Sequence, residues 1–142
     1  MKEVLWKLMK RHLKYSDTEM EDFKKNPINT VVLEKLDVLA NIEIRVEVIQ
    51  SNGCNTGYKV GDTFYYDGPG NLINNRSSRN NCGFLLGIIP SFIYAVHELI
   101  YAGIKPEEVK LRFNRAGCFD VGVANCGWGR VIIEVSVVNK AS

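Results

Sequence analysis

The stretch Ile42-Glu43-Ile44-Arg45-Val46-Glu47-Val48 decides the fold class of this chain. Apolar and charged side chains alternate along it, and this period of two predicts a half-buried antiparallel strand. Residues 130–138 repeat the pattern and predict the last strand of the chain. Shorter runs at residues 63–66 and 109–113 predict two more strands. The sequence therefore indicates a mostly antiparallel sheet.

Helices are predicted before and within this sheet region. Ser16 and Glu19 form a capping box, and Asn29 can cap a further helix. The segment after Ser91, up to about residue 102, has apolar side chains at three- and four-residue spacing and predicts one central helix packed on the sheet. The composition changes at Asn41. We therefore expect an α+β fold with a helical arm at residues 1–40 and one compact core unit at residues 41–142. The arm is expected to bury an apolar stripe made by Leu5, Leu8, Leu33 and Leu36.

Size and charge narrow the classes of protein that the sequence can represent. The chain has 142 residues, 46% of them hydrophobic and 24% charged, as in a globular domain. A net charge of +2 without a dense basic stripe argues against nucleic-acid binding. The longest apolar run, residues 84–103, is broken by Pro90 and contains His97 and Glu98, so we expect no membrane span. No secretory signal is recognised, and the expected location is the cytoplasm.

The cysteines raise the main chemical question. Each lies beside Gly or Asn in a turn-like context; they are Cys54, Cys82, Cys118 and Cys126. A reducing cytosol disfavours structural disulfides, and four thiolates can hold zinc or an iron–sulfur cluster. No Cys-x-x-Cys pair supports that site. Cys118 and Cys126 would be roughly 26 Å apart on a strand but can converge on a loop. A shared cysteine site, unliganded thiols and a single reactive thiol all stay open.

A catalytic alternative centres on the segment from residue 115 to residue 120. Cys118 or Cys54 is the candidate nucleophile, Asp120 the acid or base, and Arg115 the group that binds an anionic substrate. A surface salt bridge of Asp120 is the simpler interpretation. Trp128 lies between two glycines and offers either a face for ligand stacking or a turn aromatic packed on the sheet.

One segment resembles a recurring protein pattern. The residues Cys54-Asn-Thr-Gly57-Tyr-Lys59-Val60-Gly61-Asp62-Thr-Phe64 are similar to a Cys-x-x-Gly-x-Lys-Val-Gly-Asp-x-Phe motif of small, largely uncharacterised prokaryotic proteins. The resemblance covers residues 41–139, about two-thirds of the chain. It implies one compact α+β unit and no particular activity.

Three functional hypotheses follow from these patterns. The first is a metal- or ligand-binding or accessory protein with a cysteine-lined site, whose partner is a small molecule or a protein. The second is the enzyme with a reactive Cys described above. The third is a structural scaffold that forms a homo-oligomer through the arm at residues 1–40.

Overall fold

Two compact units make up the chain in the computed structural model, which describes residues 1–140. The first unit is Met1–Asp37, and the second begins at Val38. Composition predicts the change at residue 41. The two boundaries differ because α4 (Leu36–Ala40) contributes Leu39 to the core of the second unit.

The first unit consists of α1 (Lys2–Leu13), α2 (Asp17–Lys25) and α3 (Pro27–Glu34). Its buried side chains are Trp6, Met20 and Leu33. The predicted capping box is confirmed: the Glu19 amide donates to Ser16 Oγ at 3.2 Å, and the Ser16 amide donates to Glu19 Oε2 at 2.7 Å. This reciprocal pair explains where α2 begins.

Two details of the first unit differ from the sequence-based expectation. Leu8 is 46% exposed, because Trp6 supplies the buried contact on α1. Asn26, rather than Asn29, caps α3: its Oδ1 accepts from the Ile28 amide at 3.2 Å, and a proline follows at the first helical position. The Asn29 side chain instead donates to the Phe23 carbonyl.

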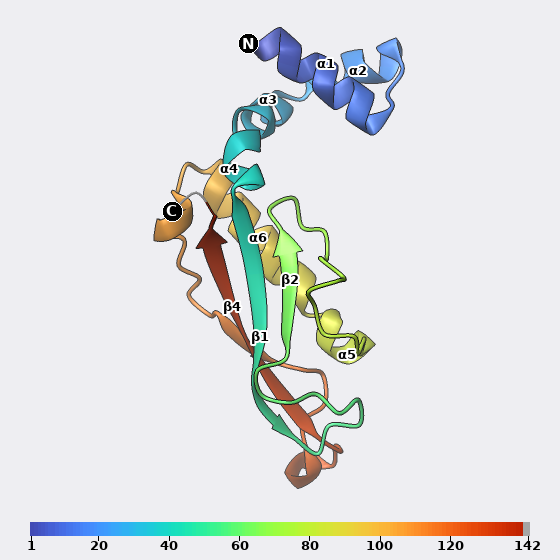
Figure 1. The fold of residues 1–142 in the computed structure, drawn as a ribbon, viewed down its shortest axis with the longest axis vertical. Coiled ribbons are helices and arrows are strands. Elements are labelled where there is room, and N and C mark those ends of the chain that lie inside the picture. The colour runs from blue at the N-terminus through green and yellow to red at the C-terminus, as the bar shows by residue number, and fades with distance from the viewer. Residues whose placement is uncertain (141–142) are drawn as a thin grey trace. The chain divides into compact units, whose positions relative to one another are not determined.

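The second unit is built on a four-stranded antiparallel sheet with the strand order β2-β1-β4-β3. The strands are β1 (Ile42–Asn52), β2 (Thr63–Asp67), β3 (Arg115–Gly117) and β4 (Arg130–Asn139). Figure 1 shows β1 between β2 and β4. The long β1–β4 pairing sets Val46 opposite Val135. The predicted α+β class is therefore shown.

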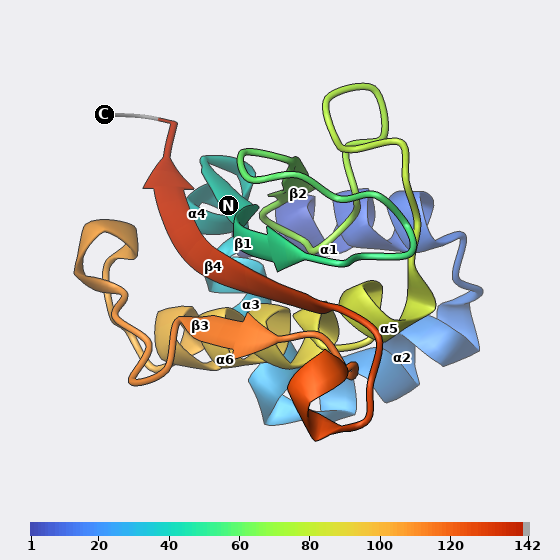
Figure 2. The same cartoon turned by 90° about the horizontal axis from the view of Figure 1, so that it is seen from below.

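One face of the sheet packs against α5 (Gly83–Leu86) and α6 (Ile89–Tyr101), and Figure 2 shows α6 lying along this face. The expected register of β1 and β4 is confirmed, with one difference at Val137, which is half-buried. The side chains of this face that become buried are Ile42, Ile44, Val46, Val48, Val131, Ile133 and Val135. Leu85, Val96 and Ile100 cover them.

The central helix begins earlier than its sequence suggests. Ser91 is not the cap, since its hydroxyl donates to the Ile88 carbonyl at 2.8 Å and α6 starts at Ile89 with Pro90 in the first turn. By length and composition, Gly83–Tyr101 is long and apolar enough to cross a membrane. In this structure four of its apolar side chains lie in the core of the second unit: Leu85, Ile89, Val96 and Ile100.

The strand expected at residues 109–113 does not form. The segment follows η1 (Pro106–Glu108) as irregular backbone, and pairing with β4 starts only at Arg115, opposite Glu134. Val109 and Leu111 pack against the core, whereas Phe113 is 71% exposed. The alternating pattern at residues 109–113 therefore reflects the packing of Val109 and Leu111 on the core, and this packing does not require the backbone to pair with a strand.

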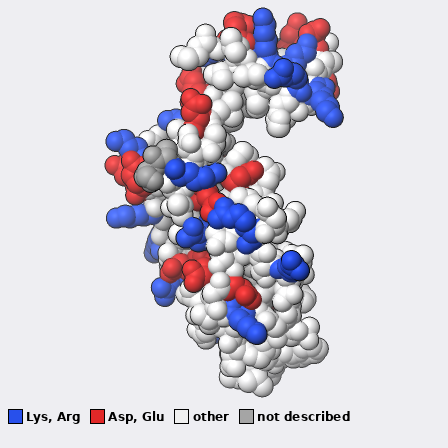
Figure 3. All heavy atoms as spheres, in the orientation of Figure 1, with Lys and Arg blue, Asp and Glu red and all other residues white. Residues whose placement is uncertain are grey.

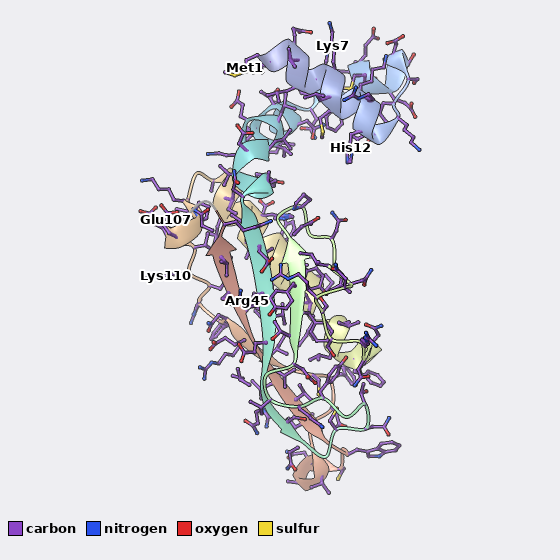
Figure 4. All side chains as sticks on the ribbon, viewed as in Figure 1. Met1, Lys7, His12, Arg45, Glu107 and Lys110 are labelled. Atoms are coloured by element: carbon purple, nitrogen blue, oxygen red, sulfur yellow. The ribbon has the colours of Figure 1, made fainter. Side chains whose placement is uncertain are left out.

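The other face of the sheet carries a buried charge. Glu43 is only 4% exposed, and the Arg76 guanidinium bonds its carboxylate at 2.5 Å. The guanidinium carbons of Arg76 and Arg45 lie 4.3 and 5.4 Å from the centre of the Tyr65 ring. Figure 4 shows Arg45 projecting from β1. The polar segment at residues 74–81 is thus anchored to the sheet through Arg76.

Candidate functional site

Three of the four cysteines line one cavity of about 230 Å³ in the second unit. Cys54 comes from the turn after β1, Cys82 from the residue before α5, and Cys118 from the residue after β3. These segments are far apart in sequence, and the sheet brings them together. Cys54, Cys82 and Cys118 therefore share one cavity lining.

The turn that carries Cys54 is shaped by the motif described above. The Lys59 amide donates to Asp62 Oδ2 at 2.8 Å, and the Asp62 amide donates back to the Lys59 carbonyl at 3.0 Å. Gly57 and Gly61 have φ angles of 79° and 96°, a region that glycine adopts without steric cost. Phe64 then enters β2 fully buried. These motif residues therefore build a turn and start a strand.

Tyr58 ties this turn to the segment that leads into α5. Its hydroxyl donates to the Asn80 carbonyl and accepts from the Cys82 amide, both at 2.9 Å. The Asn80 side chain donates to the Thr56 carbonyl at 3.1 Å. Burial raises the pKa of Tyr58, so the phenol keeps its proton and can donate at neutral pH. Three hydrogen bonds thus hold the two segments together.

Cys82 has an environment that stabilises a thiolate. Burial, the largest single effect, raises its pKa, but the Thr56 hydroxyl and the amides of Leu85 and Phe84 together outweigh burial, so the pKa of Cys82 lies below its ordinary value. Cys82 is the residue before the first turn of α5, and its side chain makes no capping hydrogen bond there. A depressed pKa is the property that makes a cysteine nucleophilic near neutral pH.

Asp120 organises the loop beside the cavity. Its carboxylate accepts from the amides of Gly122 at 3.0 Å, Trp128 at 3.0 Å and Gly129 at 2.8 Å. The amide hydrogen bonds from Gly129 and then Gly122 hold the pKa of Asp120 below its ordinary value. The Cys118 thiol donates to the Asp120 carbonyl at 3.7 Å. The carboxylate is committed to the backbone, so the geometry does not support the predicted acid or base role of Asp120.

Arg115 lies outside the cavity. Its Nε donates to Glu134 Oε2 at 2.7 Å across the β3–β4 pair, which is a salt bridge on the sheet. The proposed triad of Cys118, Asp120 and Arg115 is therefore not assembled around one reacting position. Arg130 lines the cavity instead and is the basic side chain among its described lining residues.

Cys126 separates from the other three cysteines. It follows η2 (Val123–Asn125) with a φ of 66°, is exposed, and lines a neighbouring cavity of about 440 Å³. Within residues 1–140 there is no group of three or more His, Cys, Asp or Glu side chains able to hold a metal ion. A zinc ion needs its sulfur ligands at about 2.3 Å, so the four-cysteine set suggested for zinc or an iron–sulfur cluster is not formed here.

An aromatic rim surrounds the opening. Phe84, Phe119 and Trp128 are 65%, 80% and 76% exposed, and the first two rings stack at 5.9 Å. Phe84 and Trp128 line both cavities. Figure 3 shows few charged side chains over this end of the second unit on the face drawn. Exposed apolar surface of this kind marks a site where a ligand or partner binds.

Replacing Gly129 by Ala should disrupt the cavity wall. A Cβ at this position would lie 2.2 Å from the Gly53 carbonyl oxygen, which is backbone and cannot move alone. We expect a loss of about 1–3 kcal/mol in the free energy of unfolding, measured by urea denaturation. Gly83→Ala is the control, since a Cβ there meets nothing within 4 Å. Equal stability of the two variants would contradict this account.

The Asp120 loop should also respond to pH. Because folding lowers the pKa of Asp120, its stabilising contribution is complete above the ordinary value of 3.8 and is lost as the pH falls through the lower folded-state pKa. We expect the backbone amide resonances of Trp128 and Gly129 to shift together in this acid range in an NMR titration. In the variant Asp120→Asn this shared transition should be absent; its persistence would assign the titration to another group.

Sequence patterns alone did not single out Thr56, Tyr58 or Phe84 as site residues. One signal was available for Cys82, because a cysteine between Asn81 and Gly83 directly precedes the longest apolar run of the chain. A small polar residue before such a run is typical of a helix start. Trp128 does line the cavity and is exposed, which favours the stacking alternative over packing on the sheet.

Comparisons with known proteins do not identify a relative of this chain. No family model matches the chain, and neither the search of curated proteins nor the search of solved structures finds a match. The resemblance to the small prokaryotic proteins therefore stays a prediction, and functional inference depends on the geometry of the cavity.

Proposed function

We propose that this chain is a ligand-binding protein whose cysteine-lined cavity receives a small, largely apolar molecule. The observation that carries the proposal is the convergence of Cys54, Cys82 and Cys118 on one cavity beside the exposed rings of Phe84 and Trp128. Ligand sites are typically concave, mostly apolar and equipped with a few placed polar groups.

The lining indicates the chemistry of the ligand. Aromatic rings favour a flat or hydrocarbon body, which they contact through their faces. Arg130 provides a cation for an anionic group at the edge of the ligand. A cavity of about 230 Å³ lies below the roughly 300–1,000 Å³ of drug-sized sites, which favours a small metabolite.

The proposal can be tested with phenol and indole as probes. Titration of ¹⁵N-labelled protein should shift the amide resonances of Cys82, Phe84 and Trp128 in a saturable manner. Phe84→Ala should weaken binding severalfold, because it removes a face of the cavity. Tyr94→Ala is the matched control, since Tyr94 is similarly exposed at 67% but does not line the cysteine cavity. Equal weakening by both variants, or shifts centred on α6, would reject the site.

A second candidate function is a thiol-dependent enzyme with Cys82 as the nucleophile. Burial raises the pKa of Cys82, but the Thr56 hydroxyl and two backbone amides outweigh this effect and lower it. The lowered pKa favours this candidate. The sequence suggested Cys118 or Cys54 as the nucleophile. Cys82 is preferred here because the pKa of Cys82 is lowered, whereas the Cys118 thiol donates to a backbone carbonyl. A cytoplasmic location and self-association through residues 1–40 remain predictions.

A further inference from the structure

Cys54 and Cys82 belong to two segments that are fastened to each other. Asn80 and Cys82 both bond to Tyr58, and Asn80 also bonds to the backbone of Thr56. Cys54 lies on the same turn, since the Gly57 amide donates to its carbonyl at 3.1 Å. The two sulfurs also act on one phenol: after burial, charge on Cys82 and on Cys54 raises the pKa of Tyr58. Cys54, Tyr58 and Cys82 all line the same cavity.

The other two cysteines are placed differently from Cys54 and Cys82. The Cys118 thiol points its proton at the Asp120 carbonyl, 3.7 Å away. Cys126 is exposed and does not line this cavity. Cys54 and Cys82 line the same cavity from the two segments that Tyr58 joins. A disulfide between them requires their Cα atoms to lie about 4.4–6.8 Å apart.

We propose that Cys82 and Cys54 form a redox couple that reduces hydrogen peroxide and closes to an intramolecular disulfide. The inference rests on the accessible cavity and reactive Cys82 of the proposed function. It adds a second substrate class, a hydroperoxide, and a second participating residue, Cys54.

The reaction balances in two steps. The Cys82 thiolate attacks one peroxide oxygen, the O–O bond breaks, and hydroxide leaves and takes up a proton to become water, with sulfenic acid on Cys82. The Cys54 thiol then loses its proton and its sulfur attacks the Cys82 sulfur; the S–O bond breaks, and a second water forms with the disulfide. Two electrons pass from the two thiols to one peroxide. A small dithiol restores the thiols by exchange.

Peptide mapping after peroxide treatment tests the couple. The full chain is reduced, freed of reductant, treated with stoichiometric hydrogen peroxide and blocked with N-ethylmaleimide. Trypsin places Cys54 in residues 46–59 and Cys82 in residues 80–110, whereas Cys118 and Cys126 share residues 116–130. We expect the loss of two free thiols per chain and a cross-link between the first two peptides, reversed by dithiothreitol.

Two cysteine variants sharpen the result. Cys54→Ser should stop at sulfenic acid on Cys82, trapped with dimedone. Cys126→Ser, the matched control outside this cavity, should keep the cross-link. A bridge from Cys82 to Cys118, a bridge between chains, or no bridge in the wild-type protein would overturn the couple. If Cys82 still reacts with iodoacetamide and phenol still binds in that case, the proposed function stands and only the redox couple fails.

Discussion

Replacing Cys82 by Ser is expected to abolish the fastest alkylation of the folded protein by iodoacetamide at neutral pH. The thiolate is the reacting form, and Cys82 has its pKa lowered by the Thr56 hydroxyl and two backbone amides against the effect of burial. The remaining reaction should proceed at the rate of the other three thiols. Mass spectrometry of tryptic peptides measures each rate separately, and Cys118→Ser serves as the control that leaves the fast reaction in place.

The variant Thr56→Val tests the cause of this reactivity. Losing the hydroxyl removes one group that stabilises the charged sulfur, so the pKa of Cys82 should rise and the alkylation at neutral pH should slow. A more basic thiolate is also more nucleophilic, which offsets part of the fall in rate. The midpoint of the pH–rate profile is therefore the better measurement.

Thr56→Ser keeps a hydroxyl at the same position and should restore the wild-type midpoint. If Thr56→Val and Thr56→Ser have the same midpoint in the pH–rate profile, the Thr56 hydroxyl does not set the reactivity of Cys82. If Cys82 reacts no faster than Cys126, which is exposed, the nucleophile assignment fails as a whole.

Truncating Ile133 to Ala is expected to cost about 2–5 kcal/mol in the free energy of unfolding. Ile133 is fully buried at the centre of β4, opposite Val48 of β1, and belongs to the core that α6 covers. Its removal takes apolar area out of the core and leaves a cavity. Since small domains are stable by only about 5–15 kcal/mol, the variant should unfold at a much lower urea concentration.

Two milder variants provide the comparison for Ile133→Ala. Ile133→Val removes one methylene and should cost about 0.5–1.5 kcal/mol. Val137→Ala alters a half-buried side chain on the same strand face and should cost less than Ile133→Ala. Urea denaturation followed by circular dichroism measures all three. A cost for Ile133→Ala no larger than that of Val137→Ala would place the core elsewhere.

Local patterns predicted the elements whose structure depends on neighbours in sequence. The alternation from Ile42 to Val48 gave the correct buried face of β1 because side chains on a strand alternate between its two faces. The capping box at Ser16 also formed as expected, since its partners are three residues apart. The same reasoning was wrong at residues 109–113, where alternating side chains pack on the core without strand pairing.

The candidate site required contacts that no local pattern contains. Arg115 was predicted to bind an anionic substrate beside Cys118 because the two residues are close in sequence, yet pairing with β4 places Arg115 against Glu134. Asp120 was predicted to act as acid or base, yet its carboxylate accepts hydrogen bonds from backbone amides of a loop that folds back, and these lower its pKa. Closeness in sequence thus pointed to the segment from residue 115 to residue 120, but the roles that it suggested for Arg115 and Asp120 do not fit the structure.

By itself, the sequence determined an α+β protein with an apolar sheet face, a central helix and four cysteines in turns. Only the tertiary structure decided which cysteines share a cavity, because that depends on the strand order β2-β1-β4-β3 and on the hydrogen bonds that join Tyr58 to the segment before α5. Cys54, Cys82 and Cys118 converge on one cavity, whereas Cys126, eight residues beyond Cys118, does not. Cys126 lies in a loop whose two ends are joined because the amides of Trp128 and Gly129 donate to the Asp120 carboxylate. Residues eight and nine positions apart make these contacts, so no local pattern predicts them.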